Sequence, residues 1–215
     1  MAIKKLNDYN IANKKILVRA DLNVPIENGN ISDNSRLISA IPTIKTIQSL
    51  GGITILISHF GRPDGLHKEE FSLKQVVPEL EKLLNFPVKF SSELIGINVL
   101  KKIDKLIAGE ILLLENTRFF VEEEMNDESF SKELSKLGDI FCNDAFSSSH
   151  RAHASTVGVS KLLPNCAGHL MKKEIDTLEN VLKKPQKPLT AVVGGAKIST
   201  KLNLLLNLIK KVDYL

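Results

Sequence analysis

The chain has 215 residues, of which 43% are apolar and 25% are charged, and its formal net charge is +4. This is an ordinary globular composition, and so small a charge excess does not by itself indicate nucleic acid as a partner. The sequence shows no N-terminal apolar signal segment and no run of ~18 apolar residues. We therefore expect a cytoplasmic protein without a membrane partner.

Short apolar runs alternate with segments of helical periodicity along the first 160 residues. Short, near-continuous apolar runs are typical of strands buried on both faces, and therefore of a parallel sheet. The predicted strands are 16–19, 53–58, 88–90, 111–114, 140–142 and, further on, 189–193.

Four helices are predicted between the first five strands. The first begins at Asp33 or Ser35, ends at Gly51, and turns one apolar stripe inward, made of Leu37, Ile41, Ile44 and Ile47. The others cover about 72–84, 98–107 and 129–137. Strands and helices in this alternation form βαβ units with right-handed crossovers. The predicted fold class is thus α/β, a three-layer Rossmann-like domain with a mostly parallel sheet.

The pattern changes after residue 160. A helix is predicted over 170–182, ending before Pro185 because proline cannot continue it. Strand 189–193, a Gly-Gly pair, a helix over 200–210 and the start of a strand at 212–215 follow. We expect a first domain over 1–169, a connecting helix over 170–185, and the truncated opening of a second α/β domain over 186–215, either leaning on the first domain or loosely ordered.

The residues that follow the predicted strands indicate an anion site, because ligands of parallel sheets bind outside the carboxyl ends of the strands. Only five basic residues are arginines, and four of them lie at such positions: Arg36, Arg62, Arg118 and Arg151. A planar guanidinium grips carboxylates and phosphates with paired hydrogen bonds. Further candidates in these loops are Asp21, Asn23, His59, Asp64, Asn116, Asp144, His150 and His153. Arg19, inside the first strand, is predicted to form a structural ion pair with Asp21 or Asp144.

Other kinds of site find little support. His150 and His153 have no carboxylate or cysteine at a spacing that would complete a metal site, and Cys142 and Cys166 are expected to be reduced packing residues. No Ser/His/Asp or Cys/His nucleophile signature is present. Phosphoryl transfer remains compatible, since it depends on positioning and charge neutralisation more than on a protein nucleophile.

A second phosphate signal lies in AVVGGAKISTK, residues 191–201. A strand, two glycines and a lysine at a helix start resemble a phosphate-binding loop, although the Walker pattern is absent. Lys197 and Lys201 are four residues apart and share one helical face. Two lysines in a first helical turn oppose the helix dipole, and an anionic ligand would remove that conflict.

Five motifs together resemble the phosphoglycerate kinase family, in its order and approximate spacing from residue 1 to the end. They are VRADLNVP (18–25), SHFGRPDG (58–65), LLLENTRF (112–119), NDAFSSSHRAHAST (143–156) and VVGGAKISTKLNLL (192–205). Leu22 stands where the family usually has Phe, and residues 147–149 are Ser-Ser-Ser in place of a Gly-Thr-Ala-like stretch.

The resemblance implies reversible phosphoryl transfer between 1,3-bisphosphoglycerate and ADP, giving 3-phosphoglycerate and ATP, with Mg²⁺ accompanying the nucleotide, in a monomer of two domains that close on a hinge. It implies Arg36 and Lys197 as catalytic residues and Lys201 as a nucleotide-phosphate ligand. The acid-substrate positions it implies are Asp21, Asn23, Arg36, His59, Arg62, Arg118 and Arg151.

The family's later nucleotide motifs and its acidic metal ligand are absent from these 215 residues. We therefore expect this polypeptide to keep the acid-substrate site and to lack turnover alone. Two other classes stay open: a non-catalytic anion-binding or regulatory domain, and RNA binding through the basic patch, for which stacking aromatics are lacking. A Rossmann-type dehydrogenase is disfavoured because no GxGxxG follows the first strand.

Overall fold

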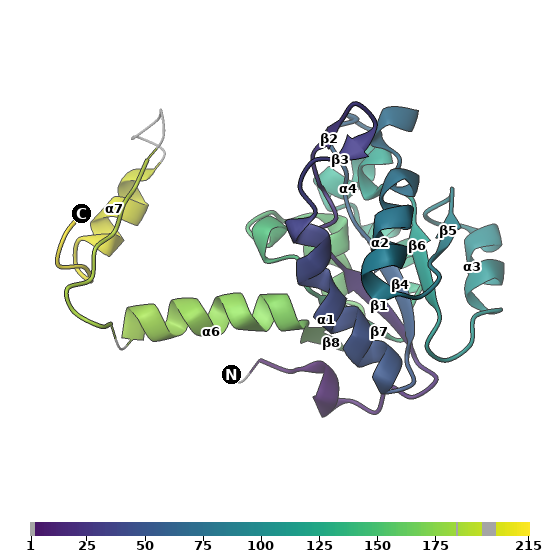
Figure 1. The fold of residues 1–215 in the computed structure, drawn as a ribbon, viewed down its shortest axis with the longest axis horizontal. Helices are drawn as coiled ribbons and strands as arrows, with labels where there is room; N and C mark the ends of the chain where they lie inside the picture. Colours follow the sequence, from purple (N-terminus) through teal and green to yellow (C-terminus); the bar gives the residue numbers. More distant parts are fainter. Residues whose placement is uncertain (1–2, 184, 195–200) are drawn as a thin grey trace. The chain divides into compact units, whose positions relative to one another are not determined.

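The structure is a computed structural model that describes residues 3–183, 185–194 and 201–215 (Figure 1). The chain divides into two compact units, Met1–Lys172 and Lys173–Leu215. The first holds all of the named strands and most of the helices. Among the described residues, no helix combines the length and the apolarity that crossing a membrane requires.

The first unit is built on a six-stranded sheet in which every pairing is parallel. The strand order is β5 (Lys89–Ser91), β6 (Ile111–Leu114), β4 (Ile53–Ile57), β1 (Lys15–Arg19), β7 (Ile140–Asn143) and β8 (Asn165–Ala167). The predicted mostly parallel α/β architecture is thus confirmed. Strand β1 lies near the centre, between β4 and β7, so the loops that follow these three strands are neighbours at one edge.

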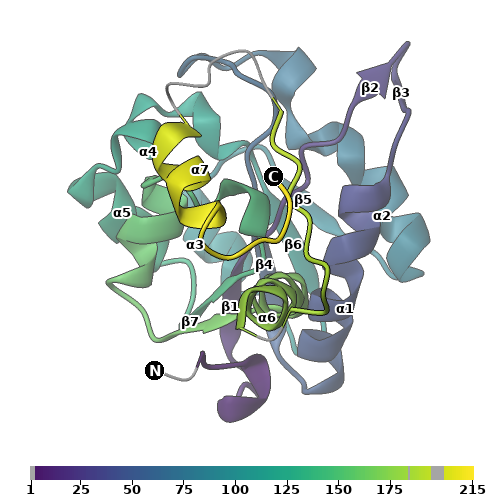
Figure 2. The same ribbon diagram turned by 90° about the vertical axis from the view of Figure 1, so that its left-hand side faces the viewer.

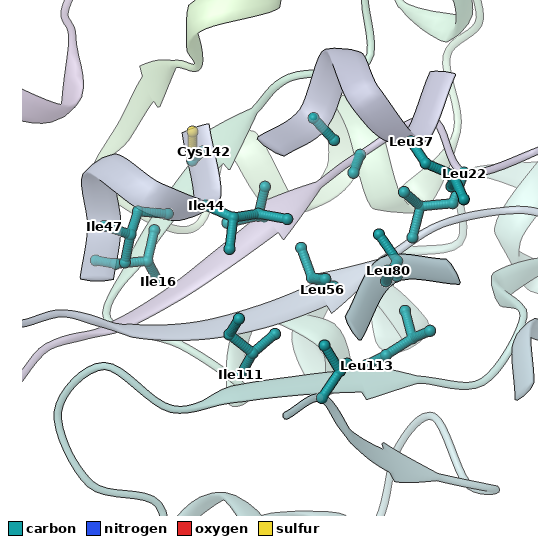
Figure 3. Packing of buried hydrophobic residues seen from close by; sticks show 14 of the residues in the cluster. Ile16, Leu22, Leu37, Ile44, Ile47, Leu56, Leu80, Ile111, Leu113 and Cys142 are labelled. Carbon is teal, nitrogen blue, oxygen red and sulfur yellow. The ribbon is translucent and has the colours of Figure 1, made fainter. Parts of the chain in front are cut away.

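Helices cover both faces of the sheet, because alternate residues of each buried strand point to opposite sides. On one face, Ile16 and Leu113 pack with α1 (Ser35–Ser49) and α2 (Val77–Leu84) in the hydrophobic cluster of Figure 3. On the other face, Leu17 and Leu112 pack with α3 (Ile97–Ile103) and α5 (Glu128–Ser135). Figure 2 shows α1 and α2 on one side of the strands and α5 on the other.

Polar side chains accept hydrogen bonds from backbone N–H groups at the starts of several helices. Asp33 Oδ1 accepts hydrogen bonds from the Ser35 backbone N–H at 2.8 Å and the Ser35 hydroxyl at 2.5 Å, which anchors the start of α1. Ser72 Oγ accepts from Lys74 N at 3.2 Å and opens a short 3-10 turn, Leu73–Val76, that leads into α2. Asp127 caps α5 through Phe130 N at 2.8 Å.

Besides several short 3-10 and π turns, three features of the fold were not predicted. They are the hairpin of β2 (Ile26–Glu27) and β3 (Asn30–Ile31), the five-residue helix α4 (Val121–Met125), and the edge strand β8. Each is too short to show a periodic apolar pattern in the sequence. The hairpin turns at Asn28 and Gly29, both with positive φ, which is the turn chemistry of a two-residue loop.

Helix α6 (His169–Lys183) begins in the first unit and continues into the second, in place of the predicted 170–182. Its first amides are capped by Asp144, whose Oδ1 accepts from Leu170 N at 2.8 Å and Met171 N at 3.2 Å. Asp144 therefore serves the helix start. Burial raises the pKa of this carboxyl above its usual value.

The second unit contains the rest of α6, a short helix α7 (Leu202–Leu208) and one parallel bridge between Thr190 and Tyr214. The prediction of a strand over 189–193 is wrong. In the described part of this unit, only Thr190 of that segment forms a β-bridge, so no regular strand results. The helix predicted over 200–210 is shorter, and Thr200 lies outside the described residues. Asp213 ties the segment by accepting from Leu189 N at 2.8 Å and Lys187 Nζ at 2.9 Å.

Candidate anion-binding site

The loops at the carboxyl ends of β1, β4 and β7, with the loop after β6, enclose a cleft of about 260 Å³. We call it the anion cleft. All five arginines of the chain line it, and none of the described residues in its lining is acidic. The lining residues are Arg19, Asn23, Arg36, His59, Gly61, Arg62, Arg118, Ser147, Ser148, His150, Arg151 and His153.

Arg36, at the start of α1, is held by a carboxylate beneath the cleft. Its NH1 lies 2.7 Å from Asp21 Oδ2, which also accepts from the Ser147 hydroxyl at 2.5 Å. Burial alone would raise the pKa of Asp21, but the Ser147 hydroxyl and the Arg36 guanidinium outweigh it and lower that pKa below its usual value. Asp21 is therefore ionised near neutrality, and it orients Arg36 while the guanidinium remains half-exposed.

The side chain of Asn23 is held in place through its amide oxygen. Its Oδ1 accepts from the Gly61 backbone N–H at 2.8 Å, which leaves the amide NH₂ as the donor that it presents to the cleft. Gly61 has φ +60°, and a Cβ there would lie 2.3 Å from the Phe71 ring. Packing against Phe71 and the backbone conformation therefore require glycine here.

Arg118 is anchored from two sides. Its NH1 donates to Gly61 O at 2.9 Å, and its Nε lies 2.8 Å from Glu124 Oε1, at an angle that leaves the buried Nε–H without a hydrogen-bond acceptor. Burial lowers the pKa of this guanidinium, with Glu124 opposing that effect. The guanidinium remains charged at any physiological pH, and its orientation is set before a ligand arrives.

Asn116 holds the loop on which Arg118 sits. Completely buried, it accepts through Oδ1 from Phe60 N and Arg118 N, both at 3.0 Å, and donates through Nδ2 to Phe60 O at 2.7 Å and Phe71 O at 2.9 Å. Its role is therefore structural, since its polar atoms are used to join the loops after β4 and β6.

Arg62 and Arg151 are exposed and line both the anion cleft and an adjoining hollow of about 480 Å³. Arg118 is the third residue common to both cavities. These three guanidiniums thus form a shared wall. They concentrate positive charge at one end of the cleft, with Arg36 and Asn23 as further members of its lining.

Arg19 does not form the predicted ion pair with Asp21 or Asp144. Its side chain is 1% exposed, and it donates from Nε to Ser155 Oγ at 2.9 Å and from NH1 to Ala20 O at 2.5 Å. Ser155 in turn donates to the fully buried Glu123, from its hydroxyl at 2.5 Å and its backbone N–H at 2.8 Å. The charge partner of Arg19 is therefore Glu123, reached through Ser155.

His59 completes this chain of contacts. Its Nδ1 lies 2.9 Å from Arg19 NH2. Burial, and then the positive charge of Arg19, lower the pKa of His59 to about 3. His153 also has a lowered pKa, through burial opposed by Glu123. Both imidazoles are therefore neutral near pH 7 and act as hydrogen-bonding groups.

The structure brings the predicted acid-substrate residues together. Six of them line the anion cleft (Asn23, Arg36, His59, Arg62, Arg118 and Arg151), and Asp21 binds one of these six. Lys197 lies outside the described residues. Lys201 belongs to the second unit, where its Nζ donates to Gly194 O. That these residues bind substrate or nucleotide stays a prediction.

Sequence reasoning missed Glu123, Ser147 and Ser155. Glu123 stands in the run VEEEM, which is indistinguishable from a solvated acidic turn, and the two serines stood in a motif read mainly for its basic residues. Among the residues that the structure describes, no group of three or more His, Cys, Asp or Glu side chains is arranged to hold a metal ion.

A parallel α/β sheet with a guanidinium-lined cleft at the carboxyl ends of its strands defines an anion-binding domain. Comparison with known proteins narrows this class. The family model described as phosphoglycerate kinase matches residues 6–215. The chain belongs to the phosphoglycerate kinase family.

Individual relatives agree. Phosphoglycerate kinases of Ruegeria pomeroyi and Rhodospirillum centenum are each 49% identical over 215 residues, which is all of this chain and 54% of each relative. The solved structure of phosphoglycerate kinase from Coxiella burnetii is similar with a TM-score of 0.86 and 39% identity, covering 99% of this chain and 53% of that one. The Pyrococcus horikoshii structure gives 0.87 and 32%, covering 97% and 53%. The chain thus spans about half the length of the relatives it matches.

Proposed function

We propose that this chain supplies the acid-substrate half of a phosphoglycerate kinase, which transfers a phosphoryl group reversibly between 1,3-bisphosphoglycerate and ADP to give 3-phosphoglycerate and ATP. The observation that carries the proposal is the convergence of all five arginines on one cleft without an acidic residue in its described lining. Such a cleft suits a small ligand with a phosphate at one end and a carboxylate at the other.

The domain roles follow the same proposal. Residues 1–169 bind 3-phosphoglycerate or 1,3-bisphosphoglycerate, residues 170–185 form the interdomain helix, and residues 186–215 begin the nucleotide-binding domain. Lys197 contacts the transferring phosphoryl group and Lys201 a phosphate of ADP or ATP. Mg²⁺ accompanies the nucleotide, and we assign no residue of this chain to the ion. We also propose a monomeric, cytoplasmic protein without nucleic-acid or membrane partners.

Within the cleft, we assign the non-reacting phosphate to the shared wall of Arg62, Arg118 and Arg151. Arg118 is already aimed by its hydrogen bond to Gly61 O, so little rotamer freedom is lost when it takes up a phosphate. The two exposed arginines complete the grip by closing on the ligand from the outer side. Positive charge at this end also favours the multiply charged anion over a neutral analogue.

The reacting end of the ligand lies toward Arg36 and Asn23 in this assignment. The substrate carboxylate is itself the nucleophile toward ATP, so no general base is needed. Arg36, oriented by Asp21, stabilises the negative charge on the transferring phosphoryl group. Asn23 donates a hydrogen bond that positions the substrate.

Replacing an arginine of the shared wall tests the binding assignment. In Arg62→Ala and Arg118→Ala, the affinity for 3-phosphoglycerate is expected to fall by about 1.5–3 kcal/mol, because each removes a charge-assisted contact to the phosphate. Isothermal titration of the 215-residue polypeptide at low salt and millimolar ligand measures this. Lys101→Ala removes the same charge outside the cleft and should leave the affinity unchanged. An Arg variant that binds like the parent would remove that residue from the site.

The same polypeptide is expected to show no turnover. In our proposal it carries the acid-substrate cleft and only Lys197 and Lys201 of the phosphoryl and nucleotide contacts, and it spans about half of its relatives' length. A coupled assay for ATP from 1,3-bisphosphoglycerate and ADP, run on residues 1–215, should give the background rate. ATP formed in proportion to the polypeptide, and lost in Arg36→Ala, would contradict this expectation.

A further inference from the structure

The contact between His59 and Arg19 fixes which ring nitrogen of His59 carries the proton. A guanidinium has only N–H donors, so the His59 Nδ1, which lies 2.9 Å from Arg19 NH2, must accept. The neutral ring then carries its proton on Nε2. No described residue is a hydrogen-bond partner of Nε2, so this N–H is the polar group that His59 leaves free in the anion cleft.

Arg19 is itself held in place by buried side chains. It is 1% exposed, Ser155 and Glu123 are both completely buried, and the chain of contacts runs from Glu123 Oε1 through Ser155 Oγ to Arg19 Nε. The Ala20 carbonyl accepts from a second guanidinium nitrogen. Each of its three nitrogens thus has one partner: Ser155 for Nε, Ala20 for NH1 and His59 for NH2. The guanidinium is therefore held in an orientation that supports His59.

We propose that Arg19, held by Ser155 and Glu123, is a positioning residue that keeps His59 as the neutral Nε2–H tautomer, so that His59 gives a phosphate or carboxylate in the cleft a hydrogen-bond donor at every pH near neutrality. The benefit to ligand binding rests on the proposed function of the cleft. The state of the His59 ring does not, because it follows from the Arg19 contact alone.

Most of the charges around His59 also keep its ring neutral. Arg19, Arg118 and Arg36 oppose protonation of the ring, whereas the carboxylate of Asp21 favours it. The neighbouring Arg62, Arg151, His150 and His153 line the same cleft. Removing the guanidinium of Arg19 would therefore do two things. The Nδ1 would lose its donor, so that the other tautomer becomes accessible, and protonation would become easier.

Nitrogen-detected NMR of the His59 side chain in residues 1–215 tests the tautomer directly, without any ligand. The parent chain and Arg19→Lys, which keeps a donor-only cation, should show the single Nε2–H form from pH 5.5 to 8. Arg19→Met should show a tautomer mixture and protonation on acidification. Ser155→Ala, which removes the hydroxyl that links Arg19 Nε to Glu123 Oε1, should shift the spectrum in the same direction if Arg19→Met does not fold. A parent spectrum with the proton on Nδ1, or variants with the parent's spectrum, would overturn the proposal.

Binding then tests the benefit. Relative to the parent, Ser155→Ala should weaken 3-phosphoglycerate binding by up to about tenfold. The ratio of the parent's affinity to that of Ser155→Ala should also depend on pH, which a simple loss of packing would not cause. In a His59→Gln background, which keeps a donor near the Nε2 position, adding Ser155→Ala should change the affinity by less than twofold. An equal loss in both backgrounds would overturn the positioning role. If the parent chain bound no 3-phosphoglycerate but its His59 remained Nε2–H, the proposed function would fail while the tautomer assignment stood.

Discussion

Glu123→Gln is expected to lower the free energy of unfolding by about 3 kcal/mol, the scale on which removing one partner of a buried charge pair destabilises a protein. Glu123 is 0% exposed, and its negative charge stabilises the charged form of the buried Arg19 more than that of Asp21 does. The amide keeps one acceptor for Ser155 but loses the charge and places an N–H against a donor. Urea denaturation at pH 7, followed by circular dichroism, measures the change.

The neighbouring Glu122 provides a matched control. It is half-buried on the same helix, and Glu122→Gln makes the same chemical change. Its effect should stay within about 0.5 kcal/mol, as for most substitutions away from buried networks. Equal effects of the two variants would show that the charge of Glu123 does not support Arg19.

Leu56→Ala is expected to cost about 2–5 kcal/mol of unfolding free energy, because it leaves a cavity that the central strands cannot close. Leu56 is 0% exposed on β4 and lies in the cluster shown in Figure 3, with Ile16 and Leu113 from the neighbouring strands. Leu66→Ala, at a side chain that is 59% exposed, is the control and should change the free energy by less than about 0.5 kcal/mol. A similar small change at Leu56 would contradict the observed packing.

The sheet was predictable where its strands are buried on both faces. The runs at β1, β4 and β6 are mostly Ile, Leu and Val, and β7 begins with the apolar residues Ile, Phe and Cys. Turn residues or capped helices separate these runs, so both the strands and their parallel pairing could be inferred. Edge strand β8 could not, because Asn165–Ala167 is only three residues long and shows no apolar run, and its place depends on pairing with β7 and on a bridge to Lys5.

The arginines of the anion cleft could be predicted from the sequence, but the buried residues that hold Arg19 in place could not. The parallel topology places residues after β1, β4, β6 and β7 at one edge, so Arg62, Arg118 and Arg151 had to be neighbours. Glu123 and Ser155 are 32 positions apart, and no local pattern distinguishes a buried glutamate from its solvated neighbours. The ion pair expected for Arg19 was wrong for the same reason, since its true partner is remote in sequence.

The strand predicted over 189–193 shows the converse limit. Its residues have strand propensity, but a strand exists only through its neighbours, and within the described part of the second unit one bridge at Thr190 is all that forms. Val192 is 94% exposed there. Apolar composition is therefore a necessary feature of a buried strand and does not by itself create one.

The strand order also has a consequence for folding kinetics. Strand β1 pairs with β4, about 38 residues away, and with β7, about 124 residues away, as in Ile16 with Thr54 and Ile140. Contacts between such distant segments carry a large loop-closure entropy and slow the folding of a domain. During synthesis, the centre of the sheet stays open on one side until β7 has left the ribosome. The anion cleft, whose walls include the loop after β7, is consequently among the last features to form.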